Sequence, residues 1–311
     1  MPTLRGFNAL RHPPPTDTSL KTMQSVQDIE LQLSGPQSDA LVKSIGIPPR
    51  PAVLLELQKE IAKEDPDLRS VARLVAGDVA LTAALLRTVN SPAFGLKRPC
   101  ETFAQAVALL GIQPLSALIT DLMVRRVLRT DGPQLTRFWD VSGKRSHALA
   151  RLSRNMGEVP PDVGQSFGLF CDVGIPLMMQ RFSDYGKTLK ACNDEPDRSF
   201  TAIEHEHHQA DHALIGGMMA RSWGVSKTVC LAIRLHHDYS IFQNPDMPHE
   251  VCQLVAMGLL AELAIQRFAG LNHSSEWDKG SDLAIGSLML TDQDVEDWVD
   301  KLLEDFSSGK A

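Results

Sequence analysis

The chain has 311 residues, of which 43% are hydrophobic and 22% charged, so its composition is that of a folded globular protein and excludes wholesale disorder. Thirty-one Lys and Arg against 38 Asp and Glu give a net charge of −7, which argues against a nucleic-acid-binding protein because phosphate recognition needs a basic face. Five cysteines without a CxxC pair predict reduced thiols in a cytoplasmic protein.

The first 38 residues differ in kind from the rest. They contain Pro13, Pro14 and Pro15 and scattered polar residues, which predicts a mobile N-terminal arm. Val26, Ile29 and Leu33 have helical spacing, so the arm can contain one short docking helix. No targeting signal is evident. The longest apolar segment, 251–265, is interrupted by Gln253 and Glu262 and is shorter than the ~20 residues that span a bilayer, so we expect a soluble protein without a membrane partner.

The next part of the chain has helical period and helical punctuation throughout. An extended lead-in over 47–51 precedes an apolar face of Leu54, Leu57 and Ile61. Asp78 is placed to cap the helix that follows it, and Asn90 ends that helix. Thr102 and Gln105 form a capping box ahead of another helix, which Gly111 closes.

The clearest interior boundary is Asp131-Gly132-Pro133. Beyond it we expect helices over about 134–156, 162–182, 211–222 and 226–237, and two or three more over 249–306, the last capped by Thr291. We find no convincing two-residue alternation, so the sequence predicts an all-α protein.

Histidines are concentrated between His205 and His249. The run 204–212 resembles a metal cluster, and His208 and His212 have the i,i+4 spacing of two ligands on one helix face. However, we expect a helix to begin near Asp211, which would break that register. The alternative is a polar, partly solvated turn between two helices, and this is the interpretation that the sequence favours.

A second group of polar residues stands out in apolar surroundings. His236 and His237 end a helix, where adjacent residues point roughly 100° apart, so we expect that both rings cannot easily reach one ion. Asp172 lies in the apolar stretch 167–174. A carboxylate there is costly unless it is paired, hydrogen-bonded or metal-bound.

Several segments, taken in order, resemble a known family. Their order and spacing are similar to those of an HDOD domain over roughly residues 40–241, and the segments are Ile47–Pro51, Asp78–Thr82, Val89–Gly95 and Ala106–Gly111. The resemblance implies an all-helical HDOD/HD-like bundle, with an N-terminal helical subdomain (39–131), an HD-like subdomain (132–241) and C-terminal helices packed on it (242–311). It also implies a relative of metal-dependent HD phosphohydrolases, of a kind found mostly in bacterial signalling proteins and generally without demonstrated catalysis.

The resemblance also implies where the HD metal site should lie. Val141 stands at the position of a first ligand histidine, and the HD dipeptide becomes Cys171-Asp172; the later histidines map to His212 and the pair His236 and His237. Valine cannot ligate, and a thiolate is a poor partner for the hard ions of phosphoryl chemistry. We therefore expect no catalytic residues and no cofactor. Asp172, His212 and His236 could still hold a single divalent transition-metal ion weakly, or form a buried hydrogen-bonded network.

The favoured function is a non-catalytic, HDOD-type signal-transduction module that acts through signalling or regulatory proteins. The first alternative is a residual metal-dependent phosphohydrolase or phosphodiesterase. The second is a sensor that binds a small molecule, such as a nucleotide, in the old active-site cavity.

Overall fold

The structure is a computed structural model that describes residues 25–91, 94, 96, 98–128, 133–271 and 274–308, and these residues form helices and turns without a strand. The all-α prediction is therefore confirmed. The helices of the first part are α1 (Val26–Ser34), α2 (Pro36–Ile45), α3 (Ala52–Ile61), α4 (Leu68–Ala76), α5 (Val79–Val89), α6 (Phe103–Leu110) and α7 (Ile112–Val127). The middle of the chain forms α8 (Pro133–Met156), α9 (Pro161–Phe170), α10 (Gly174–Arg181), α11 (Tyr185–Asp194), α12 (Phe200–His208), α13 (His212–Ser222), α14 (Lys227–Leu235) and the short 3₁₀-helix η2 (Tyr239–Gln243). The last helices are α15 (His249–Phe268), α16 (Ser275–Leu288) and α17 (Asp292–Ser307).

The helix caps are where the sequence places them. The side chain of Asp78 accepts from the amide of Leu81, and Thr102 forms a reciprocal capping box with Gln105. Thr291 makes another with Asp294. Each cap satisfies amides that the first helical turn leaves without a partner, so these helices begin at residues that the sequence itself specifies.

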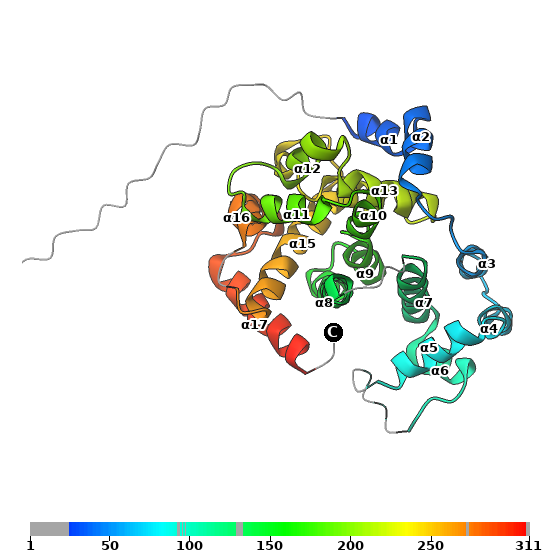
Figure 1. The fold of residues 1–311 in the computed structure, drawn as a ribbon. Helices are drawn as coiled ribbons and strands as arrows, with labels where there is room; N and C mark the ends of the chain where they lie inside the picture. The colour runs from blue at the N-terminus through cyan, green and yellow to red at the C-terminus, as the bar shows by residue number, and fades with distance from the viewer. Residues whose placement is uncertain are drawn as a thin grey trace, which may run out of the picture.

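The core is aliphatic and centres on the pair α8 and α9. Figure 1 shows these two helices side by side in the middle of the molecule, with α7 on one side and α15 on the other. Among the described residues, α15 is the one helix long and apolar enough by length and composition to cross a membrane, yet 72% of its most apolar window is buried inside the protein. The expectation that this segment is too short was wrong, because the helix runs for 20 residues. Its apolar surface is covered by its neighbours α8, α16 and α17.

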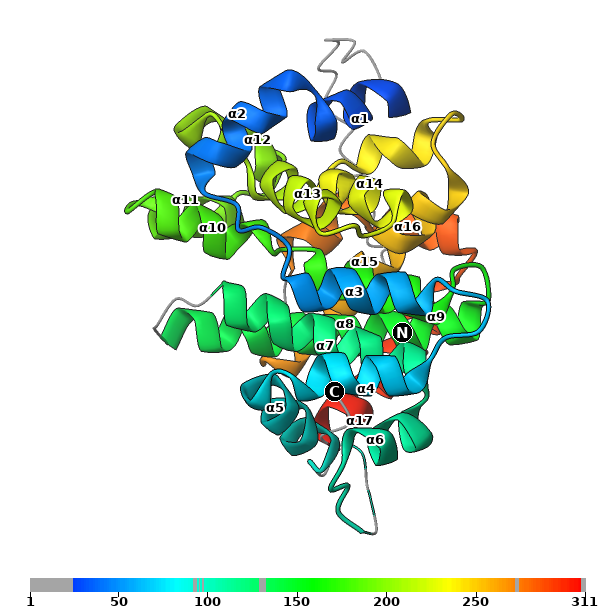
Figure 2. The same cartoon turned by 90° about the vertical axis from the view of Figure 1, so that its right-hand side faces the viewer.

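The N-terminal helices lie against the HD-like part. Ile29 and Leu33 of α1 are buried, and α1 and α2 lie across α13 and α14 (Figure 2). The docking helix expected around these residues is therefore present, and α2 follows it. The expected boundary after residue 38 falls inside α2, and that after residue 241 falls inside η2. The boundary after residue 131 and the arm over 1–24 lie outside the described residues, so the division into subdomains stays a prediction.

Trp223, at the end of α13, joins the extended lead-in over 47–51 to that helix. The Trp223 indole is buried, and its Nε1 donates to the carbonyl of Pro48 at 3.0 Å. In return, Arg50 donates to the carbonyl of Trp223 at 2.8 Å. These bonds join positions about 175 residues apart in sequence, so they place α3 against the end of α13.

The helix expected over 162–182 is broken. It forms α9 and α10, with a turn at Cys171, Asp172 and Val173 between them. Pro176 explains the break, because a proline ring clashes with the carbonyl four residues earlier, here that of Asp172. Helices α11 and α12 were not expected from the sequence. The break and these two helices bring together the polar groups described next.

Candidate functional site

Asp172 lies in the turn between α9 and α10, and two glycines let the neighbouring backbones approach it. A Cβ on Gly168 would lie 2.6 Å from Ser146 Cα of α8, and one on Gly174 would lie 2.0 Å from the carbonyl oxygen of His212. No side chain fits at either distance. The sequence thus allows the turn to lie directly between α8 and the start of α13.

His212 is the first residue of α13. The side chain of Asp211 caps this helix by accepting from Leu214 N at 2.8 Å, as the expected helix start near Asp211 requires. Helix α12 ends at His208, and Gln209 follows with a positive φ of 55°, so His208 and His212 do not share a helix. His208 instead contacts Thr188 at 2.8 Å. The run does contain the predicted turn between two helices, but Glu204 and His212 at its ends are 0% exposed, so the expected partial solvation does not extend to them.

His236 and His237 lie in the turn that follows α14, beyond its last helical residue, Leu235. Their ring centroids are 4.1 Å apart. The expectation that the two rings cannot easily reach one ion was therefore wrong, since a ring nitrogen of each lies in the same group of possible ligand atoms. Ligand atoms of Asp172, His212, His236 and His237 all lie within 4.8 Å of one another.

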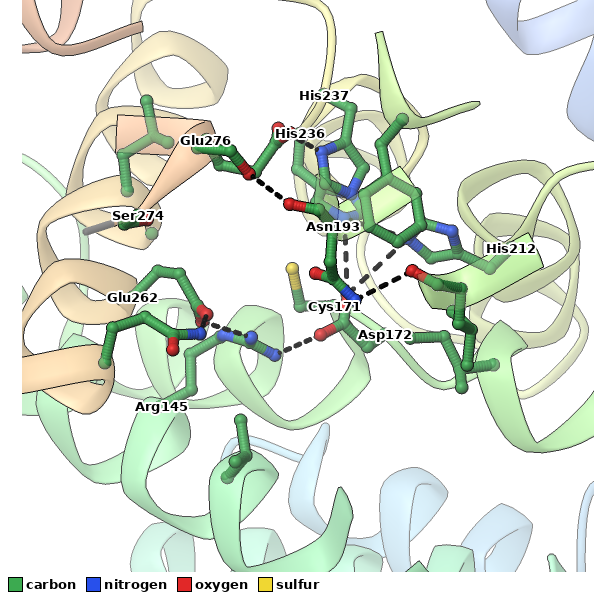
Figure 3. Close-up of a pocket in the computed structure, with 18 of the residues that line it drawn as sticks. Arg145, Cys171, Asp172, Asn193, His212, His236, His237, Glu262, Ser274 and Glu276 are labelled. Carbon is green, nitrogen blue, oxygen red and sulfur yellow. Dashed lines mark hydrogen bonds and ion pairs between the residues drawn. The ribbon is translucent and has the colours of Figure 1, made fainter. Parts of the chain in front are cut away.

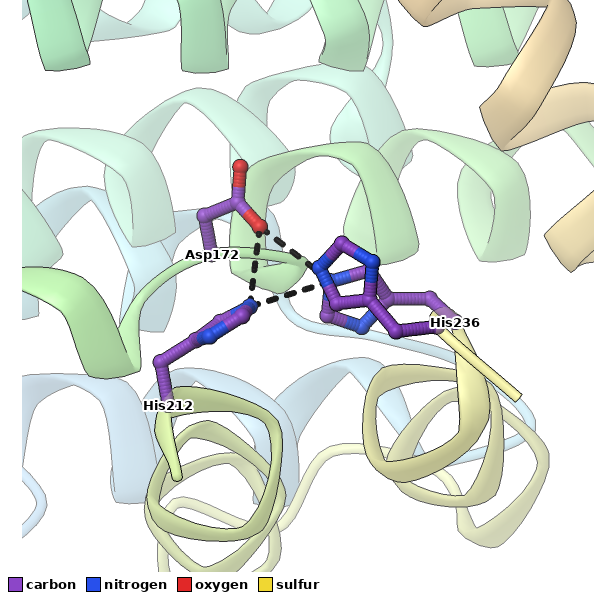
Figure 4. A group of neighbouring side chains, drawn as sticks. Asp172, His212 and His236 are labelled. Atoms are coloured by element: carbon purple, nitrogen blue, oxygen red, sulfur yellow. Dashed lines mark hydrogen bonds and ion pairs between the residues drawn. The ribbon is translucent and has the colours of Figure 1, made fainter. Parts of the chain in front are cut away.

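Three of these atoms form a tight triangle, shown in Figure 4. Asp172 Oδ1 lies 3.3 Å from His236 Nε2 and 3.6 Å from His212 Nε2, and the two Nε2 atoms are 3.2 Å apart. The Nδ1 atom of each ring faces a group that can only accept: the Glu204 carboxylate at 2.7 Å for His212, and the Ile233 carbonyl at 2.7 Å for His236. Both Nδ1 atoms therefore have to carry the proton. In the neutral rings, both Nε2 lone pairs then point at the Asp172 carboxylate, so a proton or a metal ion has to lie between them.

The charges around the triangle agree with this arrangement. Burial alone would lower the pKa of His212, but the negative charge of Glu204 and hydrogen bonds to Asp172 and Glu204 raise it to about 9. Burial is likewise outweighed at His236, whose pKa is raised well above its usual value by its interactions with Cys171 and with the Asp172 carboxylate. Without an ion, a proton is therefore held between these rings at neutral pH.

One ion fits the triangle. Bonds of about 2.1 Å at angles between right and tetrahedral place neighbouring ligand atoms about 3.0–3.4 Å apart, close to the three separations here. Imidazole nitrogen with one carboxylate suits a divalent transition-metal ion. Asp172, His212 and His236, the three residues expected from the sequence, are the ones that would hold it, with His237 as a neighbour.

An arginine occupies the other side of Asp172. Arg145 donates to Asp172 Oδ2 at 2.6 Å and to Glu262 at 2.7 Å (Figure 3). Burial would raise the pKa of Asp172, but the Arg145 charge holds it well below its usual range. Val141, one helical turn before Arg145, lines the same cavity and offers no ligand, and Cys171 lines it as well. If Asp172 bridged two ions, its Oδ2 atom would bind the second one. In this structure Oδ2 is paired with the guanidinium of Arg145.

His237 belongs to a separate pair. Its Nδ1 lies 2.6 Å from Glu276, which also accepts from Tyr239 at 2.5 Å and from Lys279 at 2.9 Å. The ring stacks on Phe200, with the ring planes only 11° apart. Burial and the charge of His236 lower the pKa of His237, so this ring is held neutral beside the triangle.

These groups line a cavity of about 580 Å³. Apolar side chains, among them Phe138, Ile175, Met179 and Leu259, line it together with about as many polar ones. A volume of this size matches a small organic ligand, and polar groups that converge on a partly apolar cavity are typical of a ligand pocket.

Sequence reasoning missed Arg145, Glu204, Glu262 and Glu276. Two of them left a signal. Arg145 follows Val141 by four residues, so it had to share a helix face with the expected ligand position. Glu262 interrupts an apolar helix, and a buried charge requires a partner. Glu204 and Glu276 come from elements whose position the sequence did not predict.

Comparison with known proteins gives one family. The model of the HDOD domain matches residues 47–239, which is more than half of the chain. An uncharacterised protein of Treponema pallidum (strain Nichols) is 26% identical over 261 residues, which are 82% of this chain and 49% of that protein. The chain thus spans about half the length of this relative.

Solved structures share the fold. A Marinobacter aquaeolei VT8 protein, whose name proposes a role in signal transduction, has a TM-score of 0.69 at 20% identity, over 86% of this chain and 59% of that one. A Shewanella amazonensis SB2B protein, whose name proposes a phosphohydrolase, has a TM-score of 0.65 at 20% identity, over 87% and 96%. An HDOD domain protein from Geobacter sulfurreducens gives 0.60 at 22% identity, over 90% and 98%.

Proposed function

Since this chain is a member of the HDOD domain family, we propose that it is a non-catalytic signal-transduction module that acts by binding signalling or regulatory proteins. The observation that supports the non-catalytic part is the position of Arg145, whose guanidinium bridges Asp172 and Glu262. The pocket keeps one set of ligand atoms and has an arginine where a second cation would have to be.

Phosphoester hydrolysis by an HD enzyme requires metal ions that lower the pKa of a water molecule and hold the phosphate. An ion bound by Asp172, His212 and His236 would supply Lewis acidity at one point. Asp172 Oδ2 is committed to Arg145, and Val141 adds no ligand. Among the described residues that line the cavity, these two positions therefore offer no ligand for a second ion opposite the first.

This proposal predicts two results for the purified protein. Elemental analysis finds no more than one transition-metal ion per chain. Phosphomonoesters, phosphodiesters and cyclic nucleotides, assayed with Mn²⁺, Fe²⁺ or Mg²⁺, are hydrolysed no faster than by the Asp172→Asn variant, which keeps the shape of the side chain and removes its charge. Metal-dependent turnover that Asp172→Asn abolishes would establish the alternative, a residual phosphohydrolase.

The cavity favours a second candidate function, the binding of a small molecule as a signal. Its mixed apolar and polar lining suits a ligand of moderate size, and a nucleotide is one such ligand. A ligand that binds only the folded state raises the midpoint of thermal unfolding. We expect a binder of this cavity to raise it in the wild type and to lose that effect when Met179, on the cavity wall, is replaced by Trp.

The proposed partners are proteins, not nucleic acid or membrane, and the proposed location is the cytoplasm. The net charge of −7 supports the first point, because a nucleic-acid or anionic lipid surface repels an acidic protein. Cross-linking in the source cell followed by recapture with purified candidates tests this, and the absence of any specific protein partner would contradict it.

A further inference from the structure

Glu204 is a fully buried carboxylate outside the metal triangle. Its residue is 0% exposed, on α12, in a run that the sequence suggested was solvated. Its two oxygens both accept hydrogen bonds, from His212 and from Tyr185, which is the bonding pattern of an ionised carboxylate. A buried charge of this kind is costly to keep, so its partners define what it does.

Both oxygens of Glu204 are used. Oε2 accepts from His212 Nδ1 at 2.7 Å and from the backbone amide of the same residue at 3.2 Å. Oε1 accepts from the hydroxyl of Tyr185, on α11. The two bonds to His212 fix the ring relative to its own backbone, and the Tyr185 bond fixes the carboxylate.

The two histidines of the triangle differ in how they are held. The Nδ1 proton of His236 is accepted by the carbonyl of Ile233, only three residues earlier, in the last turn of α14. The Nδ1 proton of His212 is accepted by a side chain from another element, α12. A rearrangement of α12 would therefore affect His212 and leave the support of His236 in place.

Helices α11 and α12 form a hairpin with a small core of its own. Cys192, Phe200 and Ile203 make a buried cluster separate from the main core, with Leu189 packed against it. The hairpin contacts the rest of the protein mainly through α10 and α13. Tyr185 and Leu189 of α11 also pack against the main core, and Glu204 forms the hydrogen bond between the hairpin and the triangle.

We propose that Glu204, oriented by Tyr185, is a positioning residue that fixes the tautomer and direction of the His212 ring, so that the affinity of the triangle for a cation depends on the α11–α12 hairpin. The statement about cation affinity rests on the single-ion pocket proposed above. The statement about the tautomer concerns the metal-free protein and does not depend on that pocket. Carboxylates that accept from the second nitrogen of a ligand histidine typically change metal affinity about 10- to 100-fold.

The test compares Glu204→Gln with Glu206→Gln. Glu206 lies two residues further along α12, exposed and paired with Arg198, so the control makes the same chemical change on the same helix. In the metal-free protein, ¹⁵N chemical shifts report which nitrogens of His212 carry a proton. In the wild type and Glu206→Gln we expect Nδ1 to carry one in the neutral ring and in the imidazolium alike, while Nε2 shares the proton of the triangle. In Glu204→Gln we expect a pH range in which Nδ1 is partly unprotonated.

The second readout is the affinity for Co²⁺, measured by calorimetry and by the visible spectrum of the bound ion. We expect Glu204→Gln to bind about 10- to 100-fold more weakly than the wild type, and Glu206→Gln to be unchanged. Tyr185→Phe keeps the carboxylate and removes its hydroxyl partner, so it should weaken binding by a smaller factor. It also decides the matter if Glu204→Gln does not fold.

The proposal is overturned if Glu204→Gln has the His212 tautomer and the Co²⁺ affinity of the wild type. If Glu204→Gln does not fold, the same result in a folded Tyr185→Phe overturns it. If the wild type binds no Co²⁺, the single-ion pocket and the dependence of cation affinity on the hairpin both fail. The ¹⁵N shifts still decide whether Glu204 positions His212, so the two failures are distinguishable.

Discussion

Replacing Asp172 by alanine is expected to lower the free energy of unfolding by about 3 kcal/mol, the lower end of the range for breaking a buried ion pair. The remaining charge is Arg145, whose side chain is 8% exposed and keeps only Glu262 as an ionic partner. The same substitution removes the carboxylate that faces the Nε2 atoms of His212 and His236. Urea denaturation followed by circular dichroism measures the change.

Asp140→Ala is the matched control for this prediction. Asp140 pairs with Lys144 on the surface of α8, and its side chain is 60% exposed. Exposed ion pairs of this kind contribute about 0.5 kcal/mol. If the two variants lose the same stability within error, the buried ion pair does not hold α8 against the turn at Asp172, and the description of the site is wrong.

The second large effect is expected for Gly174→Ala. Its Cβ would lie 2.0 Å from the carbonyl oxygen of His212 and 2.8 Å from the carbonyl carbon, so α10 and α13 have to move apart. Overpacking against backbone costs about 1–3 kcal/mol or more. The movement also separates Asp172 from His212, so the variant should lose cation affinity together with stability.

Gly286→Ala is the control, because a Cβ there meets nothing within 4 Å. In a helix, this change should stabilise by up to about 1 kcal/mol. A Gly174→Ala protein with wild-type thermal midpoint would show that α10 and α13 are not in direct contact.

Much of the helical framework could be predicted from local sequence. Caps such as Asp78, Thr102 and Thr291 act on amides within four residues, so their effect is visible in a short window. The apolar faces are equally local, and Leu54, Leu57, Leu81 and Leu85 are buried as expected. The family resemblance also singled out Asp172, His212 and His236 as possible ligands, and their ligand atoms lie close together in the structure.

The rest depends on tertiary contacts that a local pattern does not contain. The bond between Glu204 and His212 forms only because two helices meet at a left-handed residue, Gln209. The Arg145–Glu262 ion pair joins positions 117 residues apart. The break at Asp172 was the exception, since Pro176 lay in the sequence and marks where a helix cannot continue.

The pocket therefore combines a retained triangle of ligand atoms with an arginine that neutralises the far side of its carboxylate. Diffraction from crystals of the protein soaked in Mn²⁺, with anomalous data collected near the manganese edge, tests this most directly. We predict at most one anomalous peak in the cavity, within bonding distance of Asp172, His212 and His236, with Arg145 still paired to Asp172. Two peaks bridged by Asp172, with Arg145 displaced, would contradict it.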